Sequence, residues 1–149
     1  MQISQEGLDL VRTSERCVLH VYNDIAGNAS IGWGHLLHRG PILSIEAGHT
    51  ITQSQADLFL TQDLSWPETE VNLRVKQPLN QNQFDALVDF VYNLGSGTFE
   101  NSHLLDSLNR GDYASVPINL KQYVHSGGKV IPALVIRRNR EAEMFERAI

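Results

Sequence analysis

Apolar side chains recur at helical spacing most clearly between residues 80 and 95. Five of them lie on one face of a helix with 3.6 residues per turn: Phe84, Leu87, Val88, Val91 and Tyr92. Asn80 with Gln83 three residues later has the form of a capping box, and Gly95 suits the end of a helix. The pattern predicts an amphipathic helix between Asn80 and Gly95.

Weaker patterns predict further helices at residues 4–15, 52–65, 102–109 and 115–123, and from Pro132 onward. Ser4 is a candidate N-cap, and Thr52 with Gln55 forms a second candidate capping box. Pro67 fits the first turn of a continuing helix or a kink in it. We therefore expect a connecting segment, with a boundary between two lobes near residues 65–75.

Strand formers are concentrated in residues 18–22. Turn residues at Asn23-Asp24 and Gly27-Asn28 separate them from a second extended run at Ser30-Trp33, which predicts a small β-hairpin or meander. Residues 39–50 show no sustained period, and we expect them to be mostly irregular. The fold class that follows is α+β, helix dominant, with a small N-terminal lobe and a helical C-terminal lobe.

The composition of the chain argues against several classes of function. The 149 residues carry a net charge of −5, which argues against nonspecific binding of nucleic acid or of an anionic membrane. No segment approaches the roughly 18 consecutive apolar residues of a membrane span, and the N-terminal residues lack the basic and apolar regions of a signal peptide. We therefore expect no membrane insertion and no unaided export.

The single cysteine, Cys17, excludes an intramolecular disulfide framework and a clustered-cysteine zinc site. A nucleophilic role beside His20 is one interpretation, but a small apolar filler at a helix end is favoured. A metal site formed by His35, His38 and His49 is disfavoured, because the sequence has no second cluster and no HExxH motif.

The last predicted helix carries a basic cluster of Arg137, Arg138 and Arg140. Such a cluster usually forms a solvated helix face, and that is what we expect here. The alternative is pairing with carboxylates or with acids linked to sugars.

Three polar residues lie on connected edges of the small lobe: Glu15, Asp24 and Ser30. A carboxylic acid beside a carboxylate is what glycoside hydrolysis requires, since one protonates the leaving oxygen and the other handles water or positive charge. Among seventeen acidic residues this pairing alone is not specific, and ordinary capping and turn roles remain open.

An ordered series of motifs makes the pairing more specific. Glu15, Tyr22-Asn23-Asp24, Gly27 and Ser30-Ile31-Gly32-Trp33-Gly34-His35 resemble the signature of the phage-type lysozymes, glycoside hydrolase family 24. Residues 79–87, residues 90–95 and Arg137-Arg138 with Glu141 resemble the family's central and last helices. The resemblance implies one lysozyme-like domain over residues 1–149, with a small lobe at about 12–60 and a helical lobe at about 65–149 packed with the N-terminal helix. It also implies a long helix joining the lobes and a cleft between them.

The resemblance assigns roles by matching position. It makes Glu15 the general acid, Asp24 the carboxylate that orients water or stabilises positive charge, and Ser30 the hydroxyl that holds this water. The matching candidates for binding substrate are Gly34, Leu36, Asn93, Ser102 and Asn119. Local caps or turns are the alternative for Asn93, Ser102 and Asn119. Tyr22, Trp33 and Tyr123 are candidate faces for sugar rings, although core packing is the commoner use of aromatic residues. Asp63 matches the family's partner for His35.

The implied function is that of a peptidoglycan muramidase, an endolysin that cleaves the β-1,4 link between N-acetylmuramic acid and N-acetylglucosamine. We expect an inverting, monomeric enzyme without cofactor or metal, made in the host cytoplasm and reaching the wall after release by a holin. Nucleic acid is not an expected partner.

Three residues depart from the family pattern: Arg16 and Ala133 stand where Gly is usual, and Ser30 stands where Thr is usual. Arg16 could stabilise ionised Glu15, and Ser30 lacks the methyl that restricts its rotamer. The alternatives are therefore a catalytically weak module that binds peptidoglycan or a protein partner, and a lytic transglycosylase.

Overall fold

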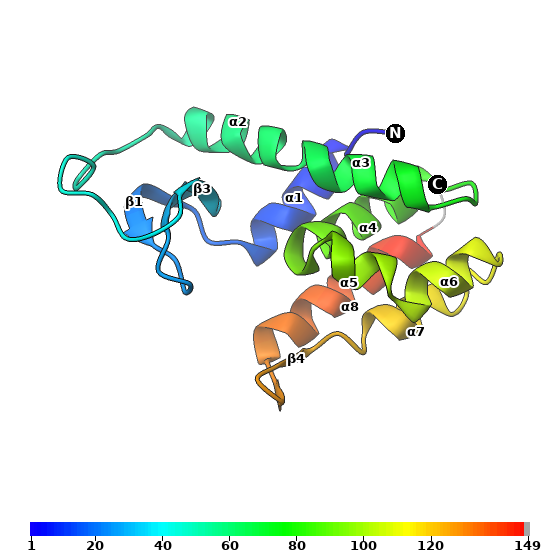
Figure 1. Ribbon diagram of the computed structural model, residues 1–149. Coiled ribbons are helices and arrows are strands. Elements are labelled where there is room, and N and C mark those ends of the chain that lie inside the picture. The colour runs from blue at the N-terminus through cyan, green and yellow to red at the C-terminus, as the bar shows by residue number, and fades with distance from the viewer. Residues whose placement is uncertain (148–149) are drawn as a thin grey trace. The chain divides into compact units, whose positions relative to one another are not determined.

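A computed structural model describes residues 1–147 of the protein (Figure 1). The elements in chain order are α1 (Gln5–Ser14), β1 (Val18–Asn23), β2 (Ala29–Gly32), β3 (His35–His38), α2 (Gln53–Asp63), α3 (Ser65–Arg74), α4 (Gln81–Leu94), α5 (Ser96–Glu100), α6 (His103–Asn109), α7 (Val116–Leu120), β4 (His125–Ser126), β5 (Lys129–Val130) and α8 (Pro132–Glu146). They form two compact units. The small unit is Glu15–Ser65, and the helical unit is Met1–Ser14 together with the chain from Trp66 onward.

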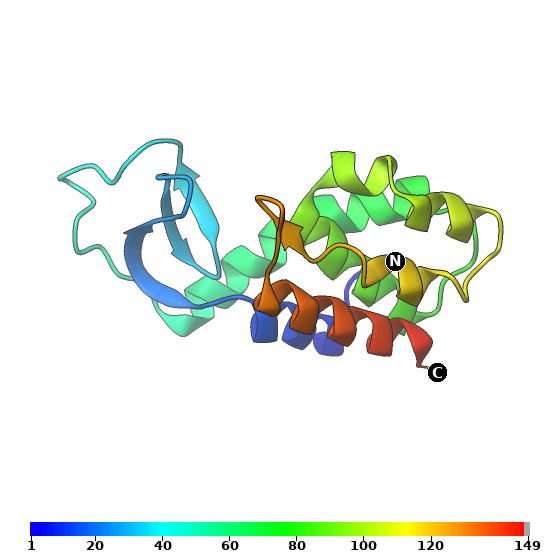
Figure 2. The ribbon, with the colours of Figure 1, turned by 90° about the horizontal axis from the view of Figure 1, so that it is seen from below.

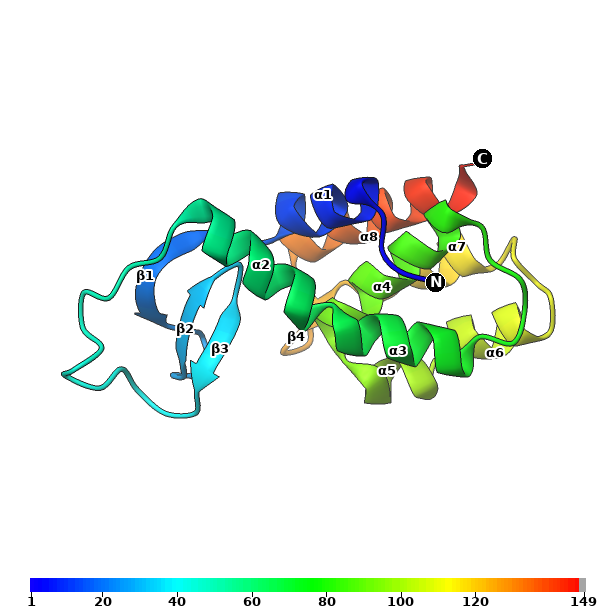
Figure 3. The same ribbon diagram turned by 90° about the horizontal axis from the view of Figure 1, so that it is seen from above.

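The small unit is built on a three-stranded antiparallel sheet with strand order β1-β2-β3 (Figure 3). All four residues of the central strand β2 are buried, and α2 packs against β2 and β3. Val21, Ala29 and Ile31 form the core of this unit, with Ile42, Ile51 and Phe59 packed around them. The predicted meander is thus confirmed, and residues 39–50 are irregular as expected.

The helical unit is organised around α4, in which residues 84–91 are all buried. Helices α1 and α8 both pack against it, and they lie side by side (Figure 2). Ser4 caps α1, because its Oγ accepts from Gly7 N at 3.1 Å. Both the backbone N–H and the hydroxyl of Ser4 also donate to the buried carboxylate of Asp85 in α4. The start of the chain is therefore fixed to the central helix by hydrogen bonds.

The capping residues expected from the sequence are confirmed. Thr52 with Gln55 and Asn80 with Gln83 form complete capping boxes. Gly95 follows α4 with φ of 87°, a conformation that disfavours residues with a Cβ.

Other elements differ from the sequence prediction. The expected long helix is divided at Leu64 into α2 and α3, and Pro67, which has no N–H to donate, lies in the first turn of α3. Residues 96–100 form the unpredicted helix α5. Gly127 and Gly128 form the turn of a small β4–β5 hairpin, with φ of 56° and 76°. The helix expected at 115–123 is the shorter α7.

The prediction that the basic cluster is a solvated face is wrong for two of its three members. Arg137 is 4% exposed and Arg138 is 0% exposed, whereas Arg140 is exposed. Arg137 donates from Nε and Nη2 to the two carboxylate oxygens of buried Asp89 in α4, at 3.0 and 2.5 Å. This ion pair allows burial, because the carboxylate compensates the charge of the guanidinium.

Cys17 is half-buried in the segment after α1, and its Sγ lies 3.7 Å from Gln53 Nε2. It therefore lies beside a polar amide and not in an apolar core. Within residues 1–147, no helix is both long and apolar enough to cross a membrane.

Candidate functional site

Glu15 and Asp24, the two predicted catalytic carboxylates, line one pocket of the small unit. The pocket has a volume of about 470 Å³, and its other lining residues are Arg16, Tyr22, Asn23, Ile25, Ala26 and Gly34. Glu15 is half-buried in the segment that follows α1, and Asp24 lies in the turn between β1 and β2. The fold therefore brings the two carboxylates to one concave surface.

The turn between β1 and β2 holds Asp24 through backbone hydrogen bonds. Asn28 N donates to Asp24 Oδ1 at 2.9 Å, and Asp24 N donates to Asn28 O at 2.8 Å. Gly27, with φ of 81°, closes the turn by donating its N–H to Asp24 O. The N–H of Asn28, with further hydrogen bonds from the turn, lowers the pKa of the Asp24 carboxyl below its ordinary value. Asp24 is therefore ionised at neutral pH.

Ser30 lies next to Asp24 from the neighbouring strand. It is 2% exposed in β2, and its Oγ donates to Asp24 Oδ2 at 3.4 Å. This distance is longer than that of a typical O–H···O bond, so the bond is weak. The structure thus brings Ser30 and Asp24 together as the sequence predicted.

Tyr22 adds a phenol to the polar groups of the pocket. Burial raises the pKa of its phenol, and the charges of Asp24 and Glu15 raise it further. The phenol therefore keeps its proton and can act as a hydrogen-bond donor in this pocket. The sequence had suggested Tyr22 only as a face for sugar rings.

Arg16 and Gly34 also line this pocket, whereas Leu36 is not among its lining residues. Arg16 is exposed and lines the same cavity as Glu15. Gly34, with φ of 90°, lies in the turn between β2 and β3, and Leu36 is 48% exposed in β3. Ala133, the third departure from the family pattern, has a negative φ, which does not require glycine.

The remaining candidates lie in the helical unit. Asn93 is half-buried in the last turn of α4, and its Oδ1 accepts from Arg138 Nη2. Ser102 is 1% exposed, and its hydroxyl caps α6 by accepting from Leu105 N at 3.1 Å. Asn119 is half-buried in α7. The hydroxyl of Ser102 is thus used in the local cap that sequence analysis gave as the alternative.

His35 forms the expected pair with Asp63. Its Nδ1 lies 3.0 and 2.9 Å from the two carboxylate oxygens of Asp63, and its ring stacks on Phe59 with centroids 4.4 Å apart. The pair connects β3 to α2 within the small unit. Among the described residues, no group of three or more His, Cys, Asp or Glu side chains is arranged to hold a metal ion.

Two of the candidate aromatic residues are engaged locally. Trp33 donates from Nε1 to Asp57 Oδ1 at 2.8 Å, and the ring of Tyr123 packs edge-on against Phe90. Both arrangements are typical of structural aromatic residues.

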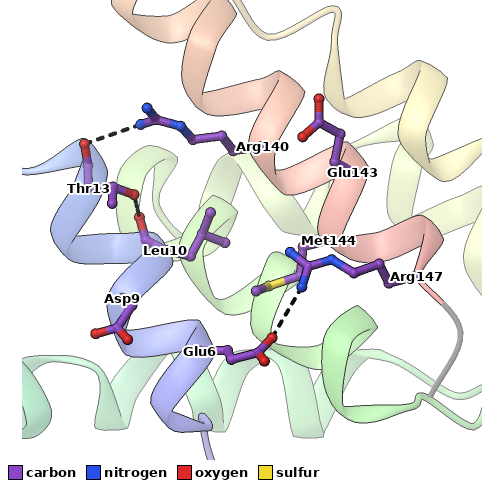
Figure 4. Close-up of a pocket in the computed structure, with 8 residues that line it drawn as sticks. All are labelled: Glu6, Asp9, Leu10, Thr13, Arg140, Glu143, Met144 and Arg147. Carbon is purple, nitrogen blue, oxygen red and sulfur yellow. Dashed lines mark hydrogen bonds and ion pairs between the residues drawn. The ribbon is translucent and has the colours of Figure 1, made fainter.

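A second pocket, of about 370 Å³, lies between α1 and α8 (Figure 4). Its two arginines are already engaged, because Arg140 donates to Thr13 O and Arg147 to Glu6 Oε2, each at 3.2 Å. None of the predicted site residues lines it. We therefore place the candidate active site in the small unit.

Sequence reasoning missed Ile25 and the contact between Asn93 and Arg138. Ile25 is fully exposed and lines the pocket beside Asp24. An apolar residue within a polar turn was the available signal for Ile25. The contact of Asn93 joins residues 45 positions apart, and no local pattern indicates it.

Comparisons of the sequence and of the structure with known proteins find relatives of the same kind. The model of the phage lysozyme family matches residues 12–141. An endolysin of Acyrthosiphon pisum secondary endosymbiont phage 1 is 35% identical, with 99% of this chain and 100% of that protein covered. The structures of an endolysin from Escherichia coli O157:H7 phage FAHEc1 and of the muramidase domain of SpmX from Asticcacaulis excentricus each superpose with a TM-score of 0.87 at 30% identity. The match to the endolysin structure covers 100% of this chain and 96% of the endolysin chain. The match to the SpmX domain covers 99% of both chains.

Proposed function

The chain belongs to the phage lysozyme family and is a glycoside hydrolase of peptidoglycan, and we propose that Glu15 is the general acid with which it cleaves the β-1,4 link between N-acetylmuramic acid and N-acetylglucosamine. The observation that carries this proposal is the pocket that Glu15 shares with Asp24. A protonated acid and an ionised carboxylate facing one sugar are the two groups that acid-assisted glycoside hydrolysis requires.

The two carboxyl groups have different roles in the reaction. Glu15 donates its proton to the glycosidic oxygen as the bond to the anomeric carbon breaks. Asp24, kept ionised by the N–H groups of its turn, orients a water molecule and stabilises the positive charge that develops on the sugar ring. Ser30 holds the same water through its hydroxyl, and its hydrogen bond to Asp24 supports this role.

We propose that the reaction inverts the configuration of the anomeric carbon. A water held by Asp24 and Ser30 attacks the anomeric carbon from the face opposite the leaving oxygen in a single displacement, and the Asp24 carboxylate accepts the proton that the water loses. This route needs roughly 6.5–9.5 Å between the two carboxyl groups, whereas a retaining route needs about 5 Å.

Substrate binding is assigned to residues of both units. Gly34 and Leu36 of the small unit and Asn93 and Asn119 of the helical unit offer backbone, apolar and amide groups to the sugar rings. Amides suit hydroxyl and acetamido groups because they both donate and accept. Ser102 contributes by fixing the start of α6 through its cap.

The proposal extends to the biological setting. The enzyme works as a monomer within a single lysozyme-like domain, is made in the host cytoplasm and reaches the wall after release by a holin.

A catalytically weak module that binds peptidoglycan is the second candidate. The observation that favours it is Arg16, which lines the pocket of Glu15 at a position where the family usually has Gly. Arg16→Gly restores the residue usual in the family. A rate that rises severalfold in Arg16→Gly supports a weakened hydrolase.

The test compares the wild type with Glu15→Gln and with Glu143→Gln, an exposed control in α8. We expect Glu15→Gln to lose at least a hundredfold in the release of reducing ends from peptidoglycan and Glu143→Gln to keep the wild-type rate. Proton NMR of the first product formed distinguishes the routes, since inversion gives the α anomer. A wild-type rate in folded Glu15→Gln contradicts the assignment of the acid.

A further inference from the structure

Arg138 is an unusual side chain to find inside the helical unit. It is 0% exposed, and its Nε and Nη1 have no hydrogen-bond partner within the part of the chain that the structure describes. Its guanidinium lies over the ring of Phe90, 5.1 Å from the centroid. Burial lowers the pKa of Arg138, which reflects the cost of keeping this cation out of water.

The neighbouring carboxyl groups compensate this cation only in part. Asp89 already binds Arg137 through both of its oxygens. Glu141 is also fully buried, and its Oε1 lies 3.2 Å from Arg138 Nη2. Burial raises the pKa of Glu141 well above its ordinary value, and the charge of Asp89 raises it further. This direction of shift favours the neutral carboxyl, which gives Arg138 less opposing charge than a carboxylate would.

This arrangement is not what stability alone favours. An apolar side chain of similar volume fills such a position without leaving N–H groups unpaired, and replacing buried ionic groups by apolar ones is often neutral or stabilising. Besides the ion pair with Glu141 and the contact with Phe90, arginine supplies a hydrogen bond to Asn93 that an apolar residue cannot make.

That hydrogen bond fixes the orientation of the Asn93 amide. A guanidinium can only donate, so it selects the amide oxygen of Asn93 and turns the NH₂ group away from itself. Within residues 1–147 the Nδ2 of Asn93 has no hydrogen-bond partner, and the side chain is half-buried, not enclosed. Asn93 lies in the last turn of α4, directly before the chain turns at Gly95. The side chain therefore presents two oriented donors and no free amide oxygen.

We propose that Arg138 is a positioning residue, which locks the amide of Asn93 so that Nδ2 donates to an oxygen acceptor of the bound glycan, an acetamido carbonyl or a sugar hydroxyl. This inference rests on the proposed function, because it deepens the role of Asn93 in substrate binding. A free amide has two orientations, and only one of them offers donors to the sugar. Locking the productive orientation before binding removes the loss of rotamer freedom that binding would otherwise cause.

The variant Asn93→Asp removes the hydrogen-bond donor to the glycan but keeps the packing of the side chain. The aspartate keeps an acceptor for Arg138 and adds the missing negative charge, but it has no hydrogen to donate. We expect a thermal midpoint at or above that of the wild type, with KM for solubilised glycan strands raised about tenfold and kcat nearly unchanged. Asn139→Asp, an exposed change of equal charge in α8, is the matched control and keeps the wild-type KM.

Arg138→Met and Arg138→Lys test the locking step. Methionine removes the donor and leaves the Asn93 amide free, so KM, measured at a temperature where the variant is folded, rises as in Asn93→Asp. Lysine keeps a donor for Oδ1 and restores KM toward the wild-type value.

The inference is overturned if Asn93→Asp, in which folding is preserved, keeps KM within twofold of the wild type. It is also overturned if folded Arg138→Met loses stability with KM unchanged, since that marks a purely structural arginine. These failures differ from failure of the proposed function, in which Glu15→Gln retains activity.

Discussion

Asp89→Asn tests the buried ion pair between α4 and α8. Asp89 is 0% exposed and binds Arg137 at 3.0 Å from Nε and 2.5 Å from Nη2. Asparagine has nearly the same shape, but it removes the negative charge and replaces one acceptor oxygen by an NH₂ group that faces a donor. Breaking a buried pair by changing one partner costs about 3–5 kcal/mol. We expect a loss of about 3 kcal/mol, since the remaining amide oxygen keeps one of the two hydrogen bonds.

Thermal unfolding followed by circular dichroism at pH 7 measures this loss. For a chain of this length about 3 kcal/mol corresponds to a decrease in Tm of roughly 6–12 °C. Asp106→Asn is the control, because Asp106 is exposed on α6, and we expect its Tm to stay within about 2 °C of the wild type. An equally small change in Asp89→Asn would refute the reasoning that this pair compensates the buried charge.

Three other changes probe local packing and charge. Gly7→Ala places a Cβ 2.6 Å from Asp85 Cγ, so overpacking outweighs the higher helix propensity of alanine, and denaturant unfolding should show a loss of about 1 kcal/mol. Asp63→Asn weakens the pair with the stacked histidine, and we expect a Tm lower by a few degrees with turnover retained. Glu46→Gln removes the carboxylate that binds His38 at 2.8 Å. That hydrogen bond raises the pKa of His38 from 6.5 and lowers the pKa of Glu46 from 4.5, so the pair stabilises most when both are charged. The Tm difference between wild type and Glu46→Gln should be largest between pH 4.5 and 6.5, and it should shrink as pH rises through the raised pKa of His38 or falls through the lowered pKa of Glu46.

Each of these three changes has a result that contradicts it. A stabilised Gly7→Ala variant would mean that α1 shifts away from α4 at little cost. Equal thermal midpoints for wild type and Asp63→Asn would remove the structural role of the histidine pair. A Tm difference for Glu46→Gln that is the same at pH 5.5 and pH 8.5 would show that charge does not carry the interaction with His38.

The parts of the fold that the sequence predicts best are those with local causes. A capping box needs only Asn80 and Gln83, and a helix end needs a residue such as Gly95 that tolerates positive φ. The turn that holds Asp24 is largely local, because its hydrogen bonds from Gly27 N and Asn28 N come from the next four residues. The shared pocket of Glu15 and Asp24 was expected from motif resemblance, and neither the spacing nor the types of these residues could establish it.

The features that the sequence did not predict depend on distant partners. The sequence around Arg137 is typical of a surface helix. Its burial depends on Asp89, which lies 48 positions earlier in the chain. Ser102 was a candidate for sugar binding because it matches a family position, but burial and the cap of α6 decide its hydrogen bonds. The hairpin at Gly127-Gly128 has only two-residue strands, too short to show a period.

The most direct test of the central claim is the chemistry of the products released from purified Gram-negative peptidoglycan by the wild type and by Glu15→Gln at equal folding. Mass spectrometry of the soluble fraction should find muropeptides with a reducing N-acetylmuramic acid end from the wild type, and none above background from Glu15→Gln. Equal release by both proteins, or products with an anhydro end, would contradict a hydrolysis that depends on the proton of Glu15.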